Sequence, residues 1–221
     1  MFAEALETPP EQIVQIYCSA SRDQGQSLDG SSMEVEIRAS LPKLKKHGRL
    51  HALRRISSLG RITYEHLAFE GDGAIKNQVI ARYLESEVEA QKQPSPALAV
   101  TPDNYKFKYE GHAQLDGRDA YVFNVKPRKK RVGLFRGSVW IDAATYLRVQ
   151  ETGFLVKNPS IFLKKVAFTR RYAIRDGMAV PVQMASVVDT LIWGQAQLEI
   201  DYSNFSVDAP QPAVSARSGG Q

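Results

Sequence analysis

The chain has 221 residues, of which 43% are hydrophobic and 24% charged, and its formal net charge is +5. This length is sufficient for one domain with a substantial core, and no apolar run approaches the ~18–20 residues that a membrane-spanning helix requires. The single cysteine, Cys18, cannot form a disulfide within this sequence.

A short N-terminal segment and an amphipathic helix come first. Residues 1–8 include Ala3-Glu4-Ala5, which resembles the end of a signal-peptidase site, so we interpret this segment as a possible signal-peptide remnant. Apolar residues then recur at helical spacing and predict a helix from about residue 9 to about residue 22. They are Ile13, Ile16, Tyr17 and Ala20.

Three strands and a second helix follow. Apolar and polar residues alternate over residues 32–44, 48–57 and 60–70, which predicts antiparallel strands with one buried face. Residues 71–96 change to a helical period and predict an amphipathic helix lying on the sheet. Its apolar face carries Ile75, Val79, Ile80, Tyr83, Leu84 and Val88.

The rest of the chain reads as a β-meander. Asp116-Gly117 and Asp176-Gly177 are strong hairpin signals. Alternating segments occupy residues 104–115, 118–128, 134–142, 146–154, 164–175, 178–193 and 195–207. We therefore expect a single mainly β (α+β) domain over residues 9–206. About ten antiparallel strands curl into an incomplete barrel covered by two helices, and residues 207–221 form a disordered tail.

A basic run and an apolar segment each allow two interpretations. The run consists of Lys126, Arg128, Lys129, Lys130 and Arg131. It is either the solvated end of a hairpin or part of a basic rim that attracts phosphate groups. Residues 154–163 hold Phe154, Leu155, Val156, Ile161, Phe162 and Leu163. They are either strand ends packed in the core or an apolar loop at the mouth of the barrel.

Signals for chemistry and for nucleic-acid binding are weak. His47 and His51 lie around a predicted turn and not on one helix face, which argues against a zinc site. The sequence has no nucleophile elbow, no phosphate-binding glycine loop and no nucleic-acid-binding motif. We expect no catalytic residue, no cofactor, no metal and no nucleic-acid partner.

Several segments resemble LolA-like outer-membrane lipoprotein-sorting proteins. They are "GRLHALRR" at 48–55, "YVFNVKPRKK" at 121–130, "FRGSVWIDAATYLRVQETG" at 135–153, "RRYAIRDGMAVPVQM" at 170–184 and "LEIDYSNF" at 198–205. The resemblance covers most of residues 10–206 in the order and type of elements. Arg55 stands where these carriers usually have Pro, and residues 71–91 replace a short hairpin and loop, which suggests a divergent branch.

The resemblance implies a LolA/LolB-like half-barrel that binds lipid or lipoprotein acyl chains without catalysis in the periplasm, with peripheral membrane contact. It also implies that Arg54 holds a helical lid shut. The expected cavity residues are Leu53, Tyr64, Leu67, Phe69, Ile80, Tyr83, Phe107, Tyr109, Phe123, Trp140 and Trp193. The alternative is an envelope regulatory or scaffolding protein with a filled cavity. It would bind a protein, such as an envelope membrane protein, at a sheet edge or at the basic rim.

Overall fold

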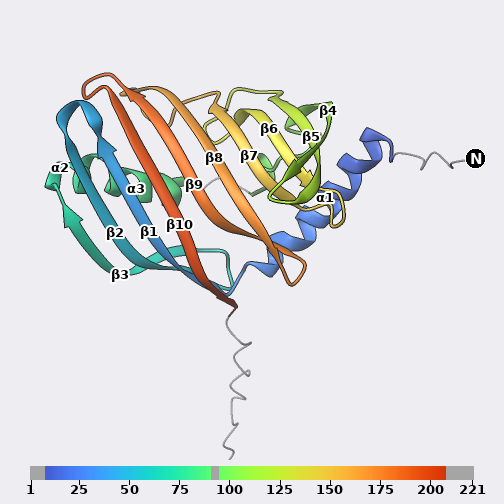
Figure 1. The fold of residues 1–221 in the computed structure, drawn as a ribbon, viewed down its shortest axis with the longest axis horizontal. Helices are drawn as coiled ribbons and strands as arrows, with labels where there is room; N and C mark the ends of the chain where they lie inside the picture. Colours follow the sequence, from blue (N-terminus) through green and yellow to red (C-terminus); the bar gives the residue numbers. More distant parts are fainter. Residues whose placement is uncertain (1–7, 91–94, 208–221) are drawn as a thin grey trace, which may run out of the picture.

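The computed structural model describes residues 8–90 and 95–207, and it shows one antiparallel sheet (Figure 1). Its ten strands follow the order β3-β2-β1-β10-β9-β8-β7-β6-β5-β4, so β3 and β4 are the two edges and the sheet does not close on itself. The expected open half-barrel is therefore confirmed. The strands are β1 (Ser31–Leu41), β2 (Lys46–Ile56), β3 (Ile62–Gly71), β4 (Tyr105–Leu115), β5 (Arg118–Pro127), β6 (Phe135–Asp142), β7 (Arg148–Leu155), β8 (Leu163–Arg175), β9 (Met178–Thr190) and β10 (Gln195–Val207).

Two helical segments lie on the concave side of this sheet, behind it in the view of Figure 1. The first is α1 (Pro10–Ser27), and the second runs continuously through α2 (Gly73–Ile75), the π-helical turn η2 (Lys76–Ile80) and α3 (Ala81–Ala90). Short 3₁₀ turns occupy Pro42–Leu44 and Ser95–Ala97. The predicted end of the first helix near residue 22 was too early. The chain turns only at residues 28–30, where Gly30 adopts a φ of 73°.

The two Asp-Gly pairs form the hairpin turns that the sequence predicts. Asp116 and Gly117 have φ angles of 51° and 79°, and they join β4 to β5. Asp176 and Gly177 have φ angles of 50° and 74°, and they join β8 to β9. Positive φ at both positions is the geometry of the two-residue turn whose twist matches that of the flanking strands.

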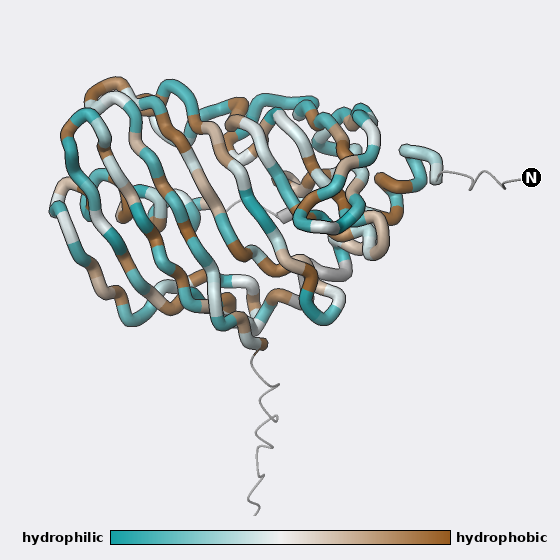
Figure 2. Tube along the Cα trace, viewed as in Figure 1, coloured by the Kyte–Doolittle hydropathy of each residue, from teal (hydrophilic) through white to brown (hydrophobic). Residues whose placement is uncertain are grey.

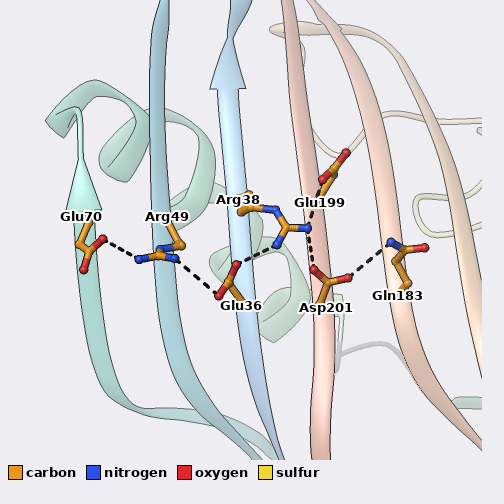
Figure 3. A network of polar contacts seen from close by, with 7 residues as sticks. All are labelled: Glu36, Arg38, Arg49, Glu70, Gln183, Glu199 and Asp201. Carbon is orange, nitrogen blue, oxygen red and sulfur yellow. Dashed lines mark hydrogen bonds and ion pairs between the residues drawn. The ribbon is translucent and has the colours of Figure 1, made fainter.

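Alternation along the strands separates an apolar concave face from a polar convex face, and the tube in Figure 2 changes colour accordingly. In β1, Val35, Ile37 and Ala39 are buried, while Glu36 and Arg38 point outward. The outward residues of five neighbouring strands form a polar network (Figure 3). Its members are Glu70, Arg49, Glu36, Arg38, Asp201, Glu199 and Gln183.

This network keeps the convex face hydrophilic. Arg38 lies 2.8 Å from Glu36 and 2.6 Å from Asp201, and Arg49 lies 2.9 Å from Glu70. The hydrogen bonds that Arg38 donates to Glu36 and Asp201 raise the pKa of Arg38. Because the partners are exposed, each pair contributes little to stability. The network instead makes the convex face compatible with water, so only the apolar concave face needs a cover.

Both edge strands contain a bulge. In β3 the register shifts between the residues paired with His51 and Leu53, where His66 adopts a φ of 52°. In β4 the register shifts between Tyr109 and Gly111, and Gly111 has a φ of 118°. A bulge leaves one residue out of the hydrogen-bond ladder and bends the strand. Neither edge is therefore a long, straight row of free backbone groups.

The turn between β6 and β7 is organised by Asp142, which is 2% exposed. Its Oδ1 accepts hydrogen bonds from the Thr145 backbone N–H at 2.8 Å, the Thr145 hydroxyl at 2.8 Å and the Ala144 N–H at 3.2 Å. A side-chain carboxylate thus satisfies backbone donors that the hairpin leaves unpaired, as in an Asx turn.

Asp142→Ala should lower the free energy of unfolding by about 2 kcal/mol, since it leaves these donors without an acceptor at a buried site. Asp142→Asn keeps the Oδ1 acceptor and should retain most of the stability. Urea denaturation of the three proteins measures both differences. Equal losses for the two variants would show that the hydrogen bonds to Oδ1 are unimportant.

Candidate functional site

The covered concave face is the candidate functional site, and its first part is an apolar cluster beneath the helical segment 73–90. We call it the β1–β2 cluster. Its buried members are Met33, Val35, Ile37, Ala39, Leu41, Leu50, Ala52, Ile75, Ile80, Met184, Ala196, Leu198 and Ile200. Gly48 permits the close approach of the helix, because a Cβ at that position would lie 2.9 Å from the Phe69 ring and 3.0 Å from Ile75.

The helical segment 73–90 is anchored unevenly. Ile75, at the end of α2, is 0% exposed, and Ile80, at the end of η2, is 2% exposed. No side chain of α3 is buried to that degree, and Val88 is 44% exposed. The amide oxygen of Gln78 is buried without a hydrogen-bond partner within the π-helical turn. The apolar anchorage therefore lies at the start of the segment, and α3 extends from it with weaker contacts.

A polar contact holds the far part of α3 to the sheet. Arg54, on the concave side of β2, donates to Glu87 of α3 with its Nη2 2.8 Å from Oε1, and the Tyr64 hydroxyl donates to the other Glu87 oxygen. Burial is the largest single influence and lowers the Arg54 pKa, but Glu87, Tyr64 and Tyr202 together outweigh it and raise the Arg54 pKa above its ordinary value. Burial, followed by the charge of Glu87, also raises the pKa of Tyr64.

The other half of the concave face is covered by α1. Ile13, Val14 and Tyr17 lie on the buried face of this helix and form one apolar cluster with inner residues of β4, β5, β6 and β8. We call this group the β5–β6 cluster. Its buried members are Ile13, Val14, Tyr17, Tyr105, Tyr121, Phe123, Val125, Leu134, Phe135, Val139, Ile141 and Phe168.

Charged residues lie between the two clusters, on β7 and β8. Glu151 is 2% exposed and accepts a hydrogen bond from the Tyr172 hydroxyl at 3.0 Å. Its oxygens also lie 3.4 Å from Arg148 Nη1 and 3.7 Å from Arg170 Nη1. The Arg148 guanidinium lies 4.8 Å from the centre of the Tyr172 ring, and that of Arg170 lies 4.8 Å from the Phe168 ring. We call Arg148, Glu151, Arg170 and Tyr172 the central polar group.

The central polar group combines enclosure with solvent access. The Arg170 side chain is 46% exposed, although its neighbours Glu151 and Phe168 are buried. Arg148 and Arg170 share the one carboxylate of Glu151, so the group carries a surplus positive charge. The Nε atom of Arg148 is buried without a hydrogen-bond partner. An arginine that is accessible, incompletely neutralised and flanked by apolar clusters is suited to an anionic group on an apolar ligand.

The structure places eight of the predicted cavity residues on the concave side. Tyr64, Phe69, Ile80, Tyr83 and Trp193 belong to or pack against the β1–β2 cluster. Phe107, Tyr109 and Phe123 do the same at the β5–β6 cluster. Arg54 also lies on this side, in contact with α3. Whether any of these residues contacts a ligand remains a prediction.

Three predicted cavity residues neither belong to nor pack against the two clusters. Leu53 is adjacent to buried Ala52 and Arg54 and pairs with outward Glu34, so it faces the convex side. Trp140 also faces the convex side, where it pairs with Val122 and Gln150, because Val139 and Ile141 occupy the inner positions of β6. Leu67 is 55% exposed and follows His66 at the β3 bulge.

The sequence prediction missed the central polar group. Arg170 and Tyr172 occupy the same face of β8 as Val166 and Phe168, which was a usable signal. Charged residues in the apolar register of a strand need partners, and Arg170 finds one in Glu151, its cross-strand neighbour in β7. Arg148 reaches the concave face because a bulge interrupts the pairing between Trp140 and Ile141.

The predicted basic run lies at one end of the sheet. Lys126 is an exposed residue near the end of β5, and Arg128, Lys129, Lys130 and Arg131 are exposed in the connection to β6. Arg128 Nε donates to the Pro102 carbonyl at 2.7 Å. Both interpretations, a solvated hairpin end and part of a basic rim, therefore remain compatible with the placement.

Comparisons with solved structures give a likeness in fold. A DUF1329 family protein from Desulfovibrio piger is similar with a TM-score of 0.50 and 18% identity, over 93% of this chain and 96% of that chain. At this identity, the likeness is one of fold. A LolA superfamily protein from Nitrosomonas europaea has a TM-score of 0.43 and 12% identity, over 90% of this chain and 94% of that chain. A putative outer membrane lipoprotein-sorting protein domain from Vibrio parahaemolyticus has a TM-score of 0.44 and 13% identity, over 92% of this chain and 95% of that chain.

No protein-family model matches the chain, and no curated protein matches it in sequence. Within residues 8–90 and 95–207, no helix has the length and apolarity needed to span a bilayer.

Burial, followed by the charge of Glu151, raises the pKa of Tyr172 to about 12. In the unfolded chain the phenol ionises near pH 10. Its contribution to stability is therefore complete below pH 10 and is lost as the pH rises toward 12. Over this interval Tyr172→Phe should reduce the slope of unfolding free energy against pH by about 1.4 kcal/mol per pH unit. Urea denaturation between pH 9 and pH 12 tests this, and identical slopes would contradict the assigned environment of Tyr172.

Proposed function

We propose that this protein is a non-catalytic binding protein for a lipid or acyl chain carrying an acidic group. The acyl part would lie between the helical segment 73–90 and the concave face, and the acidic group would contact Arg170. The observation that carries the proposal is the accessible, incompletely neutralised Arg170 between two apolar clusters on a covered face. On the strength of the sequence resemblance, the same proposal places the protein in the periplasm.

The uneven anchorage of the segment 73–90 supports a lid role for α3. Tyr83 and Leu84 contact the β1–β2 cluster without being fully buried, whereas Ile75 and Ile80 are. Outward movement of α3 about η2 would uncover apolar surface on β1, β10 and β9 while the start of the segment stays in place. An acyl chain entering there would bury the same kind of surface, at about 25 cal/mol per Å² of apolar area.

In this proposal the contact between Arg54 and Glu87 keeps the lid closed in the absence of ligand. It is well shielded, with the two side chains 9% and 20% exposed. The loss of one partner from a shielded pair costs more than the loss of an exposed pair. Opening must separate Glu87 from Arg54 and Tyr64, so this contact opposes movement of the C-terminal part of α3.

Arg170→Met tests the role of the acidic group, and Arg171→Met is a matched control. Arg171 is the next residue of β8, on the convex side, 3.6 Å from Asp116. Titration with a fluorescent fatty acid should show about tenfold weaker binding for Arg170→Met, as expected for the loss of a charge-assisted hydrogen bond. Arg171→Met should bind like the wild type, and the methyl ester of the same fatty acid should not distinguish the proteins. Equal affinities of the two variants for the fatty acid would refute the assignment of Arg170.

Arg54→Ala tests the lid, and Arg55→Ala is the control, since Arg55 lies on the opposite face with its Nε 2.9 Å from Glu65. Hydrogen exchange of the amides in residues 81–90 should accelerate by roughly tenfold or more in Arg54→Ala, because α3 loses its charged contact. It should be unchanged in Arg55→Ala. Equal exchange in all three proteins would mean that apolar packing alone holds α3.

Native mass spectrometry of protein purified without detergent tests the function as a whole. An added mass that dissociates as a lipid or acylated peptide would support the proposal. Protein that stays bare after incubation with fatty acids and phospholipids would count against it. That result would favour the protein-binding alternative, which the near-complete burial of both apolar clusters also supports.

A further inference from the structure

The antiparallel order of the strands brings several connections to one end of the sheet. β1 and β2, β5 and β6, β7 and β8, and β9 and β10 are joined at the same end, which is the upper edge in Figure 1. We call this end the upper rim. The connections after α1, β2, β4, β6 and β8 lie at the other end, the lower rim.

The upper rim exposes large apolar side chains. Ile161 is 85% exposed, Ile192 is 65% and Leu191 is 55%, and Phe162 and Leu44 are 44% and 45%. The Leu191 backbone N–H donates to the Phe162 carbonyl at 3.0 Å, so the β7–β8 and β9–β10 connections lie side by side. The second connection is the hydrophobic turn at the upper left of Figure 2. Adjacent exposed apolar loop tips indicate a binding surface more than a solvated end.

The two rims differ in charge. The upper connections carry Lys43, Lys45, Arg128, Lys129, Lys130, Arg131 and Lys157. The segments after β3 and before β4 lie at the same end and add Asp72 and Asp103 as acidic residues. The described lower connections carry Asp29, Asp116 and Asp176, with Arg61 as the basic residue. The apolar tips therefore project from the basic end of the molecule.

A shallow depression of about 420 Å³ lies beside these tips. Lys43 and Lys164 line it together with Asp189, Thr190, Gly194 and Gln195. Asp189 lies 3.4 Å from the Gln195 side-chain amide, and Thr190 Oγ1 donates to the Gly194 carbonyl at 2.7 Å. The lining therefore holds two lysines against one carboxylate, and a net positive depression next to apolar side chains matches a phosphate group attached to an acyl layer.

We propose that the upper rim docks on an anionic phospholipid membrane. Ile161, Phe162, Leu191 and Ile192 enter the acyl boundary, while Lys43, Lys164 and the Arg128–Arg131 run contact lipid phosphates. A nucleic acid would satisfy the basic residues but would leave the exposed isoleucines without an apolar environment. This surface does not depend on lipid binding beneath α3, because none of its residues belongs to the β1–β2 cluster or to the central polar group.

Vesicle co-sedimentation of the full chain tests the apolar contribution. The wild type should bind phosphatidylcholine vesicles that contain phosphatidylglycerol, and binding to pure phosphatidylcholine vesicles should be much weaker. Ile161→Asp and Ile192→Asp should each reduce binding by at least about tenfold, because a charged side chain replaces an inserted apolar one. Leu59→Asp is the control. Leu59 is 93% exposed in the β2–β3 connection of the lower rim, so its replacement should leave vesicle binding unchanged.

The electrostatic contribution is tested in the same assay. Lys43→Gln and Lys164→Gln should each weaken binding about fivefold, and added salt should weaken it further. Arg61→Gln on the lower rim should have no effect.

Failure of the wild type to bind phosphatidylglycerol-containing vesicles at low salt would overturn the proposal. So would binding that inorganic phosphate abolishes while Ile161→Asp and Ile192→Asp leave it intact, because that pattern describes a soluble-phosphate site. Fatty-acid binding in solution without vesicle binding would overturn this proposal. It would not affect the proposed ligand site between the helical segment 73–90 and the concave face.

Discussion

The structure depends on one constraint, which is that an open sheet cannot bury its own inner face. β3 and β4 end the ten-stranded sheet and do not pair with each other, so the apolar concave side needs a separate cover. α1 covers one half and the segment 73–90 covers the other, and each is held mainly by burial of apolar area. A cover of this kind differs from a closed core, because an apolar ligand can replace the helix with little change in the type of surface buried. In the proposed function, the polar contact of Arg54 with Glu87 would determine how the cover opens, and the charged residues between the two clusters would determine what enters.

Much of this arrangement could be predicted from the sequence, because strict alternation and two Asp-Gly turns specify strands and hairpins locally. The helical segment 73–90 was equally clear from its apolar face. The side of the sheet that each residue faces was harder to predict from the sequence. Leu53 is more hydrophobic than Arg54, yet the pairing of β1 with β2 directs Arg54 inward and Leu53 outward. The central polar group was missed because it depends on register. Glu151 and Arg170 meet only once β7 pairs with β8, and Arg148 turns inward only because of a bulge opposite Trp140 and Ile141. Periodicity within one segment contains neither fact.

The polar surfaces of the molecule differ in how many charged groups they leave available to a binding partner. The convex side carries a network of alternating charges in which most acidic and basic groups already have partners, so it offers few free groups for recognition (Figure 3). The upper rim differs because its lysines and arginines greatly outnumber its acids and surround exposed apolar loop tips. This asymmetry gives the molecule a direction, with a basic, partly apolar end and a more acidic end. A protein docked through the upper rim would place the concave face at a steep angle to the membrane surface.

The bulges in β3 and β4 have a consequence for self-association. An unprotected edge strand is a template on which another chain can add a strand, and repeated addition leads to fibres. Here His66 and Gly111 interrupt the ladder near the middle of each edge, and Glu65, Lys108 and Glu110 lie close to the interruptions. A second copy could match only a short stretch of backbone before meeting a bend and a charge. The same features oppose capture of a partner by strand addition, so a protein partner would have to use loops or helices. The fold can thus remain an open sheet without becoming a seed for aggregation.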